Sequence, residues 1–277
     1  MKSKSRLGTT GADYRLPGFL IIGAMKAGTT TLYEDLSNVK GIYLPPEKEP
    51  NDLILADVES DPGVMRYARK YSAAPYGSLL GDASTAYAKR PTYEGVAGRA
   101  CRVLGPDLKV IYMVRDPIRR IVSQYHHLWG LGEEHRPINE AVLVDERYVA
   151  YSRYDWQLEP WRACFPASQI LVVHLESYVQ HRAREFCRIC EFLEVGGETK
   201  VSSAHRNKSA GKAVAKHGSI MAKFAKSPTY LYRIKPIMPR GLRDAIKSLV
   251  LPKTAKLTDC LDPAIESELR ARIRSLD

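Results

Sequence analysis

The sequence has few cysteines and no long apolar run. Its 277 residues include five scattered cysteines, a number and spacing typical of reduced thiols rather than of a disulfide framework. No stretch of about 18 apolar residues is present, so we expect no membrane-spanning helix. The polar, basic residues 1–15 lack the apolar centre of a secretory signal. These absences together predict a cytoplasmic protein.

Acidic residues are almost absent from residues 201–257, where 13 lysines and arginines accompany the single acid Asp244. The formal charge of the whole chain is +11, so all of the positive excess lies in this segment and the rest of the chain is close to neutral. Such a local excess indicates an anionic partner: nucleic acid, anionic lipid, an acidic glycan or a phosphorylated cofactor. Base-stacking motifs and a basic recognition helix are not evident, so we expect no nucleic acid partner.

Within this basic segment, Ile220–Lys226 mixes apolar and cationic residues. This composition is typical of segments that contact an anionic membrane surface, which would place the protein at the inner face of a membrane. A plain solvated basic face, or a binding module built around this segment, remains an alternative. The sequence does not choose among them.

Apolar strands alternate with amphipathic helices from residue 18 to about residue 193. The predicted strands are 18–23, 109–114 and 170–173, and the predicted helices are 29–38, 117–129, 183–193 and a final one at 262–276. This alternation favours an α/β fold of three layers, with a central parallel sheet flanked by helices. We expect a single domain over 1–277, with residues 1–17 flexible and 201–257 as a basic covering segment.

A glycine-containing loop, residues 23–31, joins the first predicted strand to its helix. Glycines let the backbone approach a ligand, and the amides at a helix start point toward an anion. Gly23 and Gly28 have the spacing of a P-loop, but Thr29 stands where an ATP-binding P-loop has lysine. The lysine lies three positions earlier, at Lys26. We therefore predict a P-loop NTPase-like fold whose lysine lies beside a group on a 5′-phosphate.

Two segments of this chain resemble the nucleotide-binding elements of sulfotransferases that use 3′-phosphoadenosine-5′-phosphosulfate (PAPS). Lys26–Tyr33 is similar to the loop that binds the 5′-phosphosulfate, and Val110–Tyr125 is similar to the 3′-phosphate site. The resemblance implies that PAPS is the co-substrate and that no metal is needed. It assigns cofactor binding to Lys26, Ala27, Gly28, Thr29, Thr30, Arg115 and Ser123.

The segment Glu47-Lys48-Glu49-Pro50 resembles a loop that carries a catalytic glutamate in glycan-sulfating members of this family. The resemblance assigns the general base to Glu49, which would accept the proton of an acceptor hydroxyl. Family members continue with His-Phe-Phe, whereas this chain has residues 51–53, Asn-Asp-Leu. Residues 81–87 resemble a substrate-cleft turn in which some members have lysine at the position of Ala83. The resemblance covers residues 18 to about 195.

The function implied by the resemblance is transfer of a sulfuryl group from PAPS to a hydroxyl of a saccharide or glycolipid. Lys26, as a catalytic residue, would stabilise the charge that grows on the departing 5′-phosphate. A small alcohol or phenol as acceptor is an alternative. A P-loop kinase is a further alternative, which would need lysine at position 29 and would use Asp116 to hold magnesium. We interpret Asp116 instead as the cap of the helix that begins with Pro117.

Overall fold

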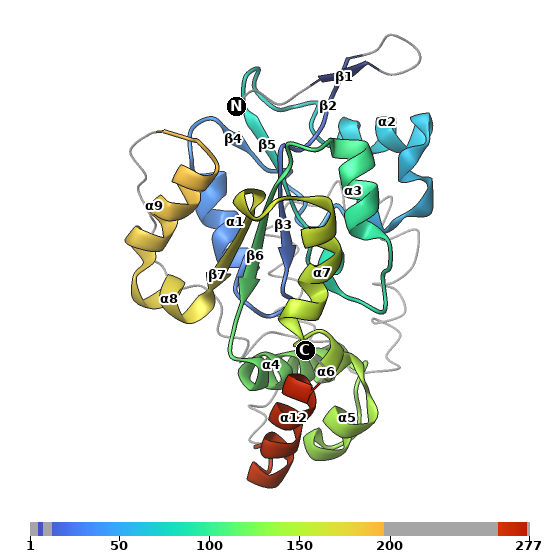
Figure 1. The fold of residues 1–277 in the computed structure, drawn as a ribbon, viewed down its shortest axis with the longest axis vertical. Coiled ribbons are helices and arrows are strands. Elements are labelled where there is room, and N and C mark those ends of the chain that lie inside the picture. The colour runs from blue at the N-terminus through green and yellow to red at the C-terminus, as the bar shows by residue number, and fades with distance from the viewer. Residues whose placement is uncertain (1–4, 8–12, 197–259, 276–277) are drawn as a thin grey trace, which may run out of the picture.

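The computed structural model describes residues 5–7, 13–196 and 260–275. At its centre lies a sheet of five parallel strands in the order β4-β5-β3-β6-β7 (Figure 1). The strand bounds are Ile42–Tyr43 for β4, Leu79–Ala83 for β5, Phe19–Gly23 for β3, Lys109–Val114 for β6 and Ile170–His174 for β7. The predicted parallel sheet is confirmed, and three of its strands were predicted within one residue at each end.

Helices cover both faces of this sheet and the edge at the carboxyl ends of its strands (Figure 1). On one face lie α1 (Thr29–Ser37), α8 (Leu175–Gln180) and α9 (Arg182–Phe192). On the other lie α2 (Asp61–Arg69), α3 (Val96–Leu104) and α7 (Tyr154–Cys164). Because helices flank both faces, the strands consist mostly of apolar residues, and every residue of β3 is buried. The predicted three-layer α/β arrangement is confirmed.

A second apolar core lies beyond the carboxyl ends of the strands. It is formed by α4 (Pro117–Leu131), α5 (Ile138–Val144), α6 (Arg147–Ala150) and α12 (Pro263–Ser275) (Figure 1). Leu269 and Ile273 of α12 belong to the same buried cluster as Ile118 and Ile121 of α4. The predicted amphipathic C-terminal helix is thus confirmed, and it packs against the helix that follows Arg115.

Strand β5 was not predicted, because Gly81 and Asp82 are residues that strands usually avoid. Gly81 pairs with Phe19 of β3, and a Cβ at this position would come within 2.2 Å of the Phe19 ring. Glycine is therefore required by the close approach of two neighbouring strands. The strand makes the predicted substrate-cleft turn start at the carboxyl edge of the sheet.

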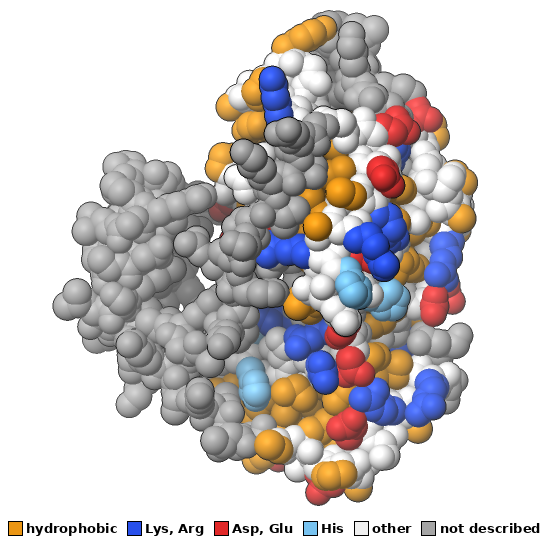
Figure 2. Space-filling model, turned by 90° about the vertical axis from the view of Figure 1, so that its left-hand side faces the viewer, with side chains coloured by type: hydrophobic (Ala, Val, Ile, Leu, Met, Phe, Trp, Pro, Cys, Tyr) orange, Lys and Arg blue, Asp and Glu red, His pale blue; other side chains and the backbone are white. Residues whose placement is uncertain are grey.

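The two ends of the chain are only partly described. Where the sequence predicts a flexible N-terminus, β1 (Ser5–Leu7) and β2 (Asp13–Arg15) pair as an antiparallel hairpin. The basic segment 201–257 lies outside the described residues, so its predicted roles stay predictions, as does the single-domain assignment. On the described surface seen in Figure 2, basic side chains are interspersed with acidic ones. Among the described helices, none has the length and apolar character needed to cross a membrane.

Candidate active site

The predicted site residues converge on the carboxyl edge of the sheet, where open α/β folds bind their ligands. Lys26 follows β3, Arg115 follows β6 directly, and Glu49 lies in the loop after β4. Because β3 lies between β5 and β6, the Lys26 loop has Arg115 on one side and the turn after β5 on the other. The order of the strands therefore brings three segments that are distant in sequence to one edge.

The loop after β3 has a backbone that requires glycine at Gly28. This residue has φ +85°, and a Cβ would meet Leu175 Cδ1 at 2.5 Å. Lys26 is also left-handed, with φ 69°, a conformation that non-glycine residues adopt only where their surroundings hold it. Ala24 N–H donates to the carbonyl of Met113 at 2.6 Å, which ties the loop to β6. The loop is thus a shaped backbone turn rather than an extended connection.

The N-terminus of α1 is built to receive an anion. In the described part of the chain, the N–H groups of Gly28, Thr29 and Thr30 donate no backbone hydrogen bond, and no side chain caps the helix. Its first turn also contains no acidic residue. Unsatisfied amides and the positive end of a helix together favour a phosphate or sulfate group. The residues assigned to the 5′-phosphosulfate therefore fit such a group.

The N-terminus of α4, in contrast, is already capped. Asp116 accepts a hydrogen bond from Arg119 N–H at 2.9 Å and pairs with Arg270 of α12 at 3.2 Å. The interpretation of Asp116 as a helix cap is confirmed. Across the described residues, no group of three or more histidines, cysteines or acids is arranged to hold a metal ion.

Arg115 points its guanidinium toward the Lys26 loop, with Nη1 3.4 Å from the Lys26 carbonyl oxygen. The Arg115 carbonyl accepts a hydrogen bond from Tyr154 Oη at 2.8 Å. The N–H of the following residue, Asp116, donates to Glu176 Oε1 at 3.2 Å. Among the described residues, no carboxylate pairs with Arg115. Its guanidinium therefore remains available to an anionic ligand beside the loop.

Ser123 lies on α4, six residues after its first residue, and is half-buried. This places it about two turns along the helix that Arg115 precedes. Within the described residues its side chain forms no hydrogen bond to Arg115. The structure thus joins Arg115 to the Lys26 loop directly, and places Ser123 on the neighbouring helix.

Glu49 lies against the end of β5, in the left-handed region with φ 65°. Its N–H donates to the Ala83 carbonyl at 3.1 Å, and its Oε1 accepts from Lys48 Nζ at 2.8 Å and Thr85 Oγ1 at 3.2 Å. Burial acts to raise the pKa of this carboxyl, but Lys48, Lys89 and Thr85 together hold the pKa below its usual range. Glu49 is therefore ionised at neutral pH, as a proton acceptor must be.

Lys89 is a charged neighbour of Glu49 that sequence reasoning missed. It follows the helical turn Thr85–Ala88, is half-buried, and has its Nζ 6.0 Å from the centre of the Tyr151 ring. Burial lowers the pKa of Lys89, and the charge of Glu49 opposes this effect. A single lysine after an apolar turn carries no pattern that would have marked it. With Lys48, it makes the surroundings of Glu49 positive.

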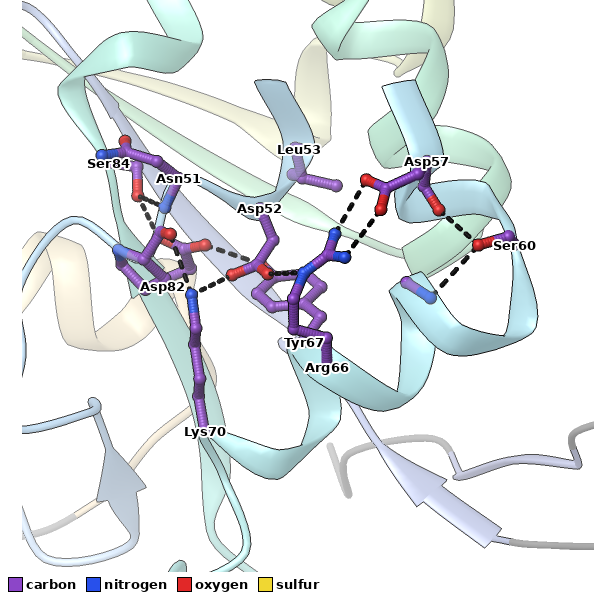
Figure 3. Close-up of polar contacts among 12 residues, drawn as sticks. Asn51, Asp52, Leu53, Asp57, Ser60, Arg66, Tyr67, Lys70, Asp82 and Ser84 are labelled. Carbon is purple, nitrogen blue, oxygen red and sulfur yellow. Dashed lines mark hydrogen bonds and ion pairs between the residues drawn. The ribbon is translucent and has the colours of Figure 1, made fainter. Parts of the chain in front are cut away.

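Asp82 at the end of β5 is a second missed residue, drawn in Figure 3. It is fully buried, and its carboxylate accepts hydrogen bonds from Tyr67, Tyr87 and Ser84, each at 2.6 Å. Burial raises the pKa of Asp82, while the three hydroxyl groups act in the opposite direction. Two tyrosines and a serine near one aspartate were the available signal, but their convergence depends on the fold.

Known proteins are similar to this chain in sequence. A family model described as a sulfotransferase domain matches residues 98–227, a range that includes Arg115 and Ser123. Human heparan sulfate glucosamine 3-O-sulfotransferase 6 is 28% identical over 200 residues, which span 65% of this chain and 52% of that protein. A protein of Dictyostelium discoideum named membrane-associated sulfotransferase is 32% identical over 114 residues, 40% of this chain and 23% of that protein.

The crystal structure of a sulfotransferase from Alicyclobacillus acidocaldarius has the same architecture. It superposes with a TM-score of 0.60 at 25% identity, covering 69% of this chain and 86% of that one. This chain spans about half the length of the heparan sulfate relatives it matches. The fold is thus the P-loop NTPase-like fold of sulfotransferases. These matches agree with the resemblance of residues 26–33 and 110–125 to sulfotransferase segments, and they show that the chain is similar to sulfotransferases.

Proposed function

We propose that this chain transfers a sulfuryl group from PAPS to a hydroxyl group of an acceptor. The observation that carries the proposal is the uncapped N-terminus of α1, with Lys26 in its loop and Arg115 hydrogen-bonded to that loop. An uncapped helix beside two cations favours a ligand with more than one anionic group. PAPS has anionic groups at its 5′ and 3′ positions.

On the donor side, the N–H groups of Gly28, Thr29 and Thr30 would hold the 5′-phosphosulfate together with Lys26. These groups are fixed before the ligand binds, so they stabilise developing charge without rearranging. Arg115 and Ser123 would bind the 3′-phosphate, with a guanidinium suited to two parallel hydrogen bonds. PAPS supplies the activated sulfuryl group. Positioning and charge stabilisation by these residues would provide most of the rate enhancement.

On the acceptor side, Glu49 would accept the hydroxyl proton as the acceptor oxygen attacks sulfur. Its position against β5, next to the β3 loop, is compatible with this role. Lys48 and Lys89 keep Glu49 ionised and leave a positive environment for an acceptor. The chain's own cations and helix terminus supply the positive charge, so the proposal includes no metal.

A saccharide or glycolipid is the acceptor we favour. Its support is the resemblance of residues 47–50 to glycan-sulfating members and the similarity of the chain to heparan sulfate sulfotransferases. A small alcohol or phenol is the second candidate, because residues 51–53 depart from the family pattern. A cytoplasmic location and peripheral contact with an anionic membrane are predictions that depend on residues outside the described part.

The proposal is tested by ligand-induced thermal shifts and by product analysis. We expect 3′-phosphoadenosine 5′-phosphate to raise the Tm of the protein, and ATP with magnesium to raise it much less. Mass spectrometry would then detect an added sulfate on saccharide acceptors incubated with PAPS. Selective stabilisation by ATP would overturn the proposal in favour of a kinase. Transfer to phenols but not to saccharides would retain the sulfotransferase and replace the acceptor.

A further inference from the structure

The loop that follows Glu49 has an unusual backbone. Glu49 and Asn51 both lie in the left-handed region, with φ 65° and 58°, although neither is glycine. Side chains with a Cβ disfavour this region, and such residues persist where the surrounding structure fixes them. Two of them within three residues indicate that residues 49–53 are held in place by strong external contacts.

Those contacts come from two buried hydroxyl groups at the end of β5. The N–H of Asn51 donates to Ser84 Oγ at 3.1 Å, and the N–H of Leu53 donates to Tyr87 Oη at 3.4 Å. Each hydroxyl donates its own hydrogen to Asp82 at 2.6 Å, and Figure 3 shows the contact between Ser84 and Asp82. A hydroxyl that donates to a carboxylate presents its lone pairs to another donor. Asp82 therefore orients both hydroxyls toward the loop.

A cation at the C-terminal end of α2 holds the same loop from another side. Lys70 Nζ donates to the Pro50 carbonyl at 2.9 Å and also pairs with the buried carboxylate of Asp52. Figure 3 shows Lys70 reaching this part of the loop beside Ser84 and Asp82. Together with the hydrogen bond from Glu49 N–H to Ala83, these contacts span the whole segment 49–53. The loop is thus fixed along its length rather than at one point.

We propose that Asp82, Ser84 and Tyr87 form a hydroxyl bridge that positions Glu49 for proton transfer. The bridge rests on the proposed function, because it acts through the carboxylate assigned as the general base. None of its three residues needs to contact the acceptor. Asp82 and the two hydroxyls hold the backbone of residues 51 and 53. This backbone in turn fixes the direction in which the Glu49 side chain points.

Tyr67 provides a matched control for this inference. It donates to the same Asp82 carboxylate at 2.6 Å, is equally buried, and comes from α2 rather than from the turn after β5. Removing its hydroxyl deletes one hydrogen bond to Asp82, as Tyr87→Phe and Ser84→Ala do. Only Tyr87→Phe and Ser84→Ala also remove an acceptor of the loop's N–H groups. Effects specific to the bridge therefore separate from a general loss of stability.

Amide hydrogen exchange of the whole protein tests the bridge without any activity measurement. Ser84→Ala should accelerate exchange of the Asn51 amide, and Tyr87→Phe that of the Leu53 amide, each by roughly tenfold, as loss of one hydrogen bond predicts. Tyr67→Phe lies outside the bridge, so the exchange rates of both amides should stay within about twofold of the wild-type rates. Unchanged exchange in Ser84→Ala and Tyr87→Phe, or equal acceleration in all three variants, would overturn the bridge.

A double-mutant cycle with Glu49→Gln tests whether the bridge acts through Glu49. Ser84→Ala should lower kcat roughly tenfold in the wild-type background, leave the KM for PAPS unchanged, and lower kcat less than twofold in Glu49→Gln. An equal effect of Ser84→Ala in both backgrounds would refute the positioning role. If Glu49→Gln itself retains full activity, the general base of the proposed function fails, and the exchange rates then decide the bridge on their own.

Discussion

The guanidinium of Arg115 lies 3.4 Å from the carbonyl oxygen of Lys26, although 89 positions separate the two residues in sequence. The contact is possible because β3 and β6 are neighbouring parallel strands whose carboxyl ends meet. The segments that resemble a 5′-phosphosulfate loop and a 3′-phosphate site therefore lie next to each other at one edge of the sheet. The distance between them is set by the sheet, which supports a single ligand with two anionic groups.

Lys26→Ala should reduce kcat for sulfuryl transfer by roughly 10²- to 10³-fold, the range for loss of a preorganised group that stabilises developing charge. The reason is that Lys26 lies in the loop that precedes the uncapped start of α1. Formation of 3′-phosphoadenosine 5′-phosphate measures the rate. Lys40→Ala, which changes an exposed lysine after α1, is the control and should retain normal activity. Near-normal turnover by Lys26→Ala would remove this residue from the mechanism.

Arg115→Ala should abolish the preference for 3′-phosphoadenosine 5′-phosphate over adenosine 5′-monophosphate. We expect roughly a 10- to 100-fold loss of affinity for the first nucleotide, because charged hydrogen bonds to phosphate are lost, and little change for the second. Ser123→Ala should show a smaller loss of the same kind. Isothermal titration calorimetry measures both affinities. Arg119→Ala, an exposed arginine of the next turn, should behave as wild type; equal losses for both nucleotides would contradict the assignment.

The pH dependence of kcat/KM should show an acidic limb below pH 4.5, the ordinary pKa of a glutamic acid. Burial alone would raise the pKa of Glu49, but Lys48, Lys89 and Thr85 lower it overall. Activity should therefore persist as pH falls toward 4.5, because the carboxylate stays ionised. Lys48→Gln removes one of the lowering charges, so its acidic limb should shift to higher pH.

Glu49→Gln is the reference for this pH experiment. This variant should show no acidic limb. Its kcat/KM should also fall by roughly 10²- to 10⁴-fold, the usual contribution of a general base. Circular dichroism at each pH separates titration of the site from acid unfolding. If the limb remained in Glu49→Gln, or if Lys48→Gln left it unmoved, another group would be the base.

Glu134 should stabilise the protein in a pH-dependent way, independently of the site. Its carboxylate is buried in the loop between α4 and α5, and hydrogen bonds from Arg136 hold its pKa at about 2, below the ordinary 4.5. Because the pKa is lower in the folded state than in the unfolded state, the ionised carboxylate stabilises the folded protein above pH 4.5. This stabilisation disappears as the pH falls toward 2. Glu134→Gln should therefore lose roughly 2 to 3 kcal/mol at pH 7.

Urea unfolding at pH 7, 5 and 3 measures this effect. The difference between wild type and Glu134→Gln should narrow as the pH falls below 4.5. Glu133→Gln, one residue earlier and exposed, should have no such dependence. A difference that is constant with pH would mean that packing of the side chain, rather than its charge, is responsible.

The positions of Lys26 and Arg115 could be predicted from the sequence because their signals are local. An apolar run ending in glycine predicts β3 and its loop, and Pro117 after Asp116 marks the start of α4. Arg115 and Lys26 lie at fixed offsets from these elements. Their contact then follows from the pairing of β3 with β6, which an alternation of strands and helices already favours.

The surroundings of Glu49 could not be predicted in the same way, because their signals are long-range. Asp82 is tolerated inside a strand only because hydroxyls from Tyr67, Tyr87 and Ser84 satisfy it. These partners come from another helix and from the following turn, and nothing in the local pattern of residues 79–83 indicates them. The left-handed backbone of Glu49 depends on the same surroundings.

Helix α7 illustrates a local signal that was misleading. Pro160 lies inside it, although helix interiors usually exclude proline. Proline removes the N–H that would bond to the carbonyl four residues earlier. That carbonyl, of Trp156, instead accepts a hydrogen bond from Arg90 Nη1 at 2.8 Å. The Trp156 carbonyl, which has no partner within the helix because of Pro160, is thus satisfied by a residue 66 positions away in sequence.

The left-handed backbone at Glu49 also has an evolutionary consequence. A non-glycine residue in this conformation costs roughly 1 to 2 kcal/mol, so glycine would relieve strain at this position. Glycine would also remove the carboxylate that accepts hydrogen bonds from Lys48 and Thr85. Selection for stability and selection for activity therefore act in opposite directions at position 49. A lineage no longer selected for the proposed sulfuryl transfer would be expected to replace Glu49 early, with no loss of folding.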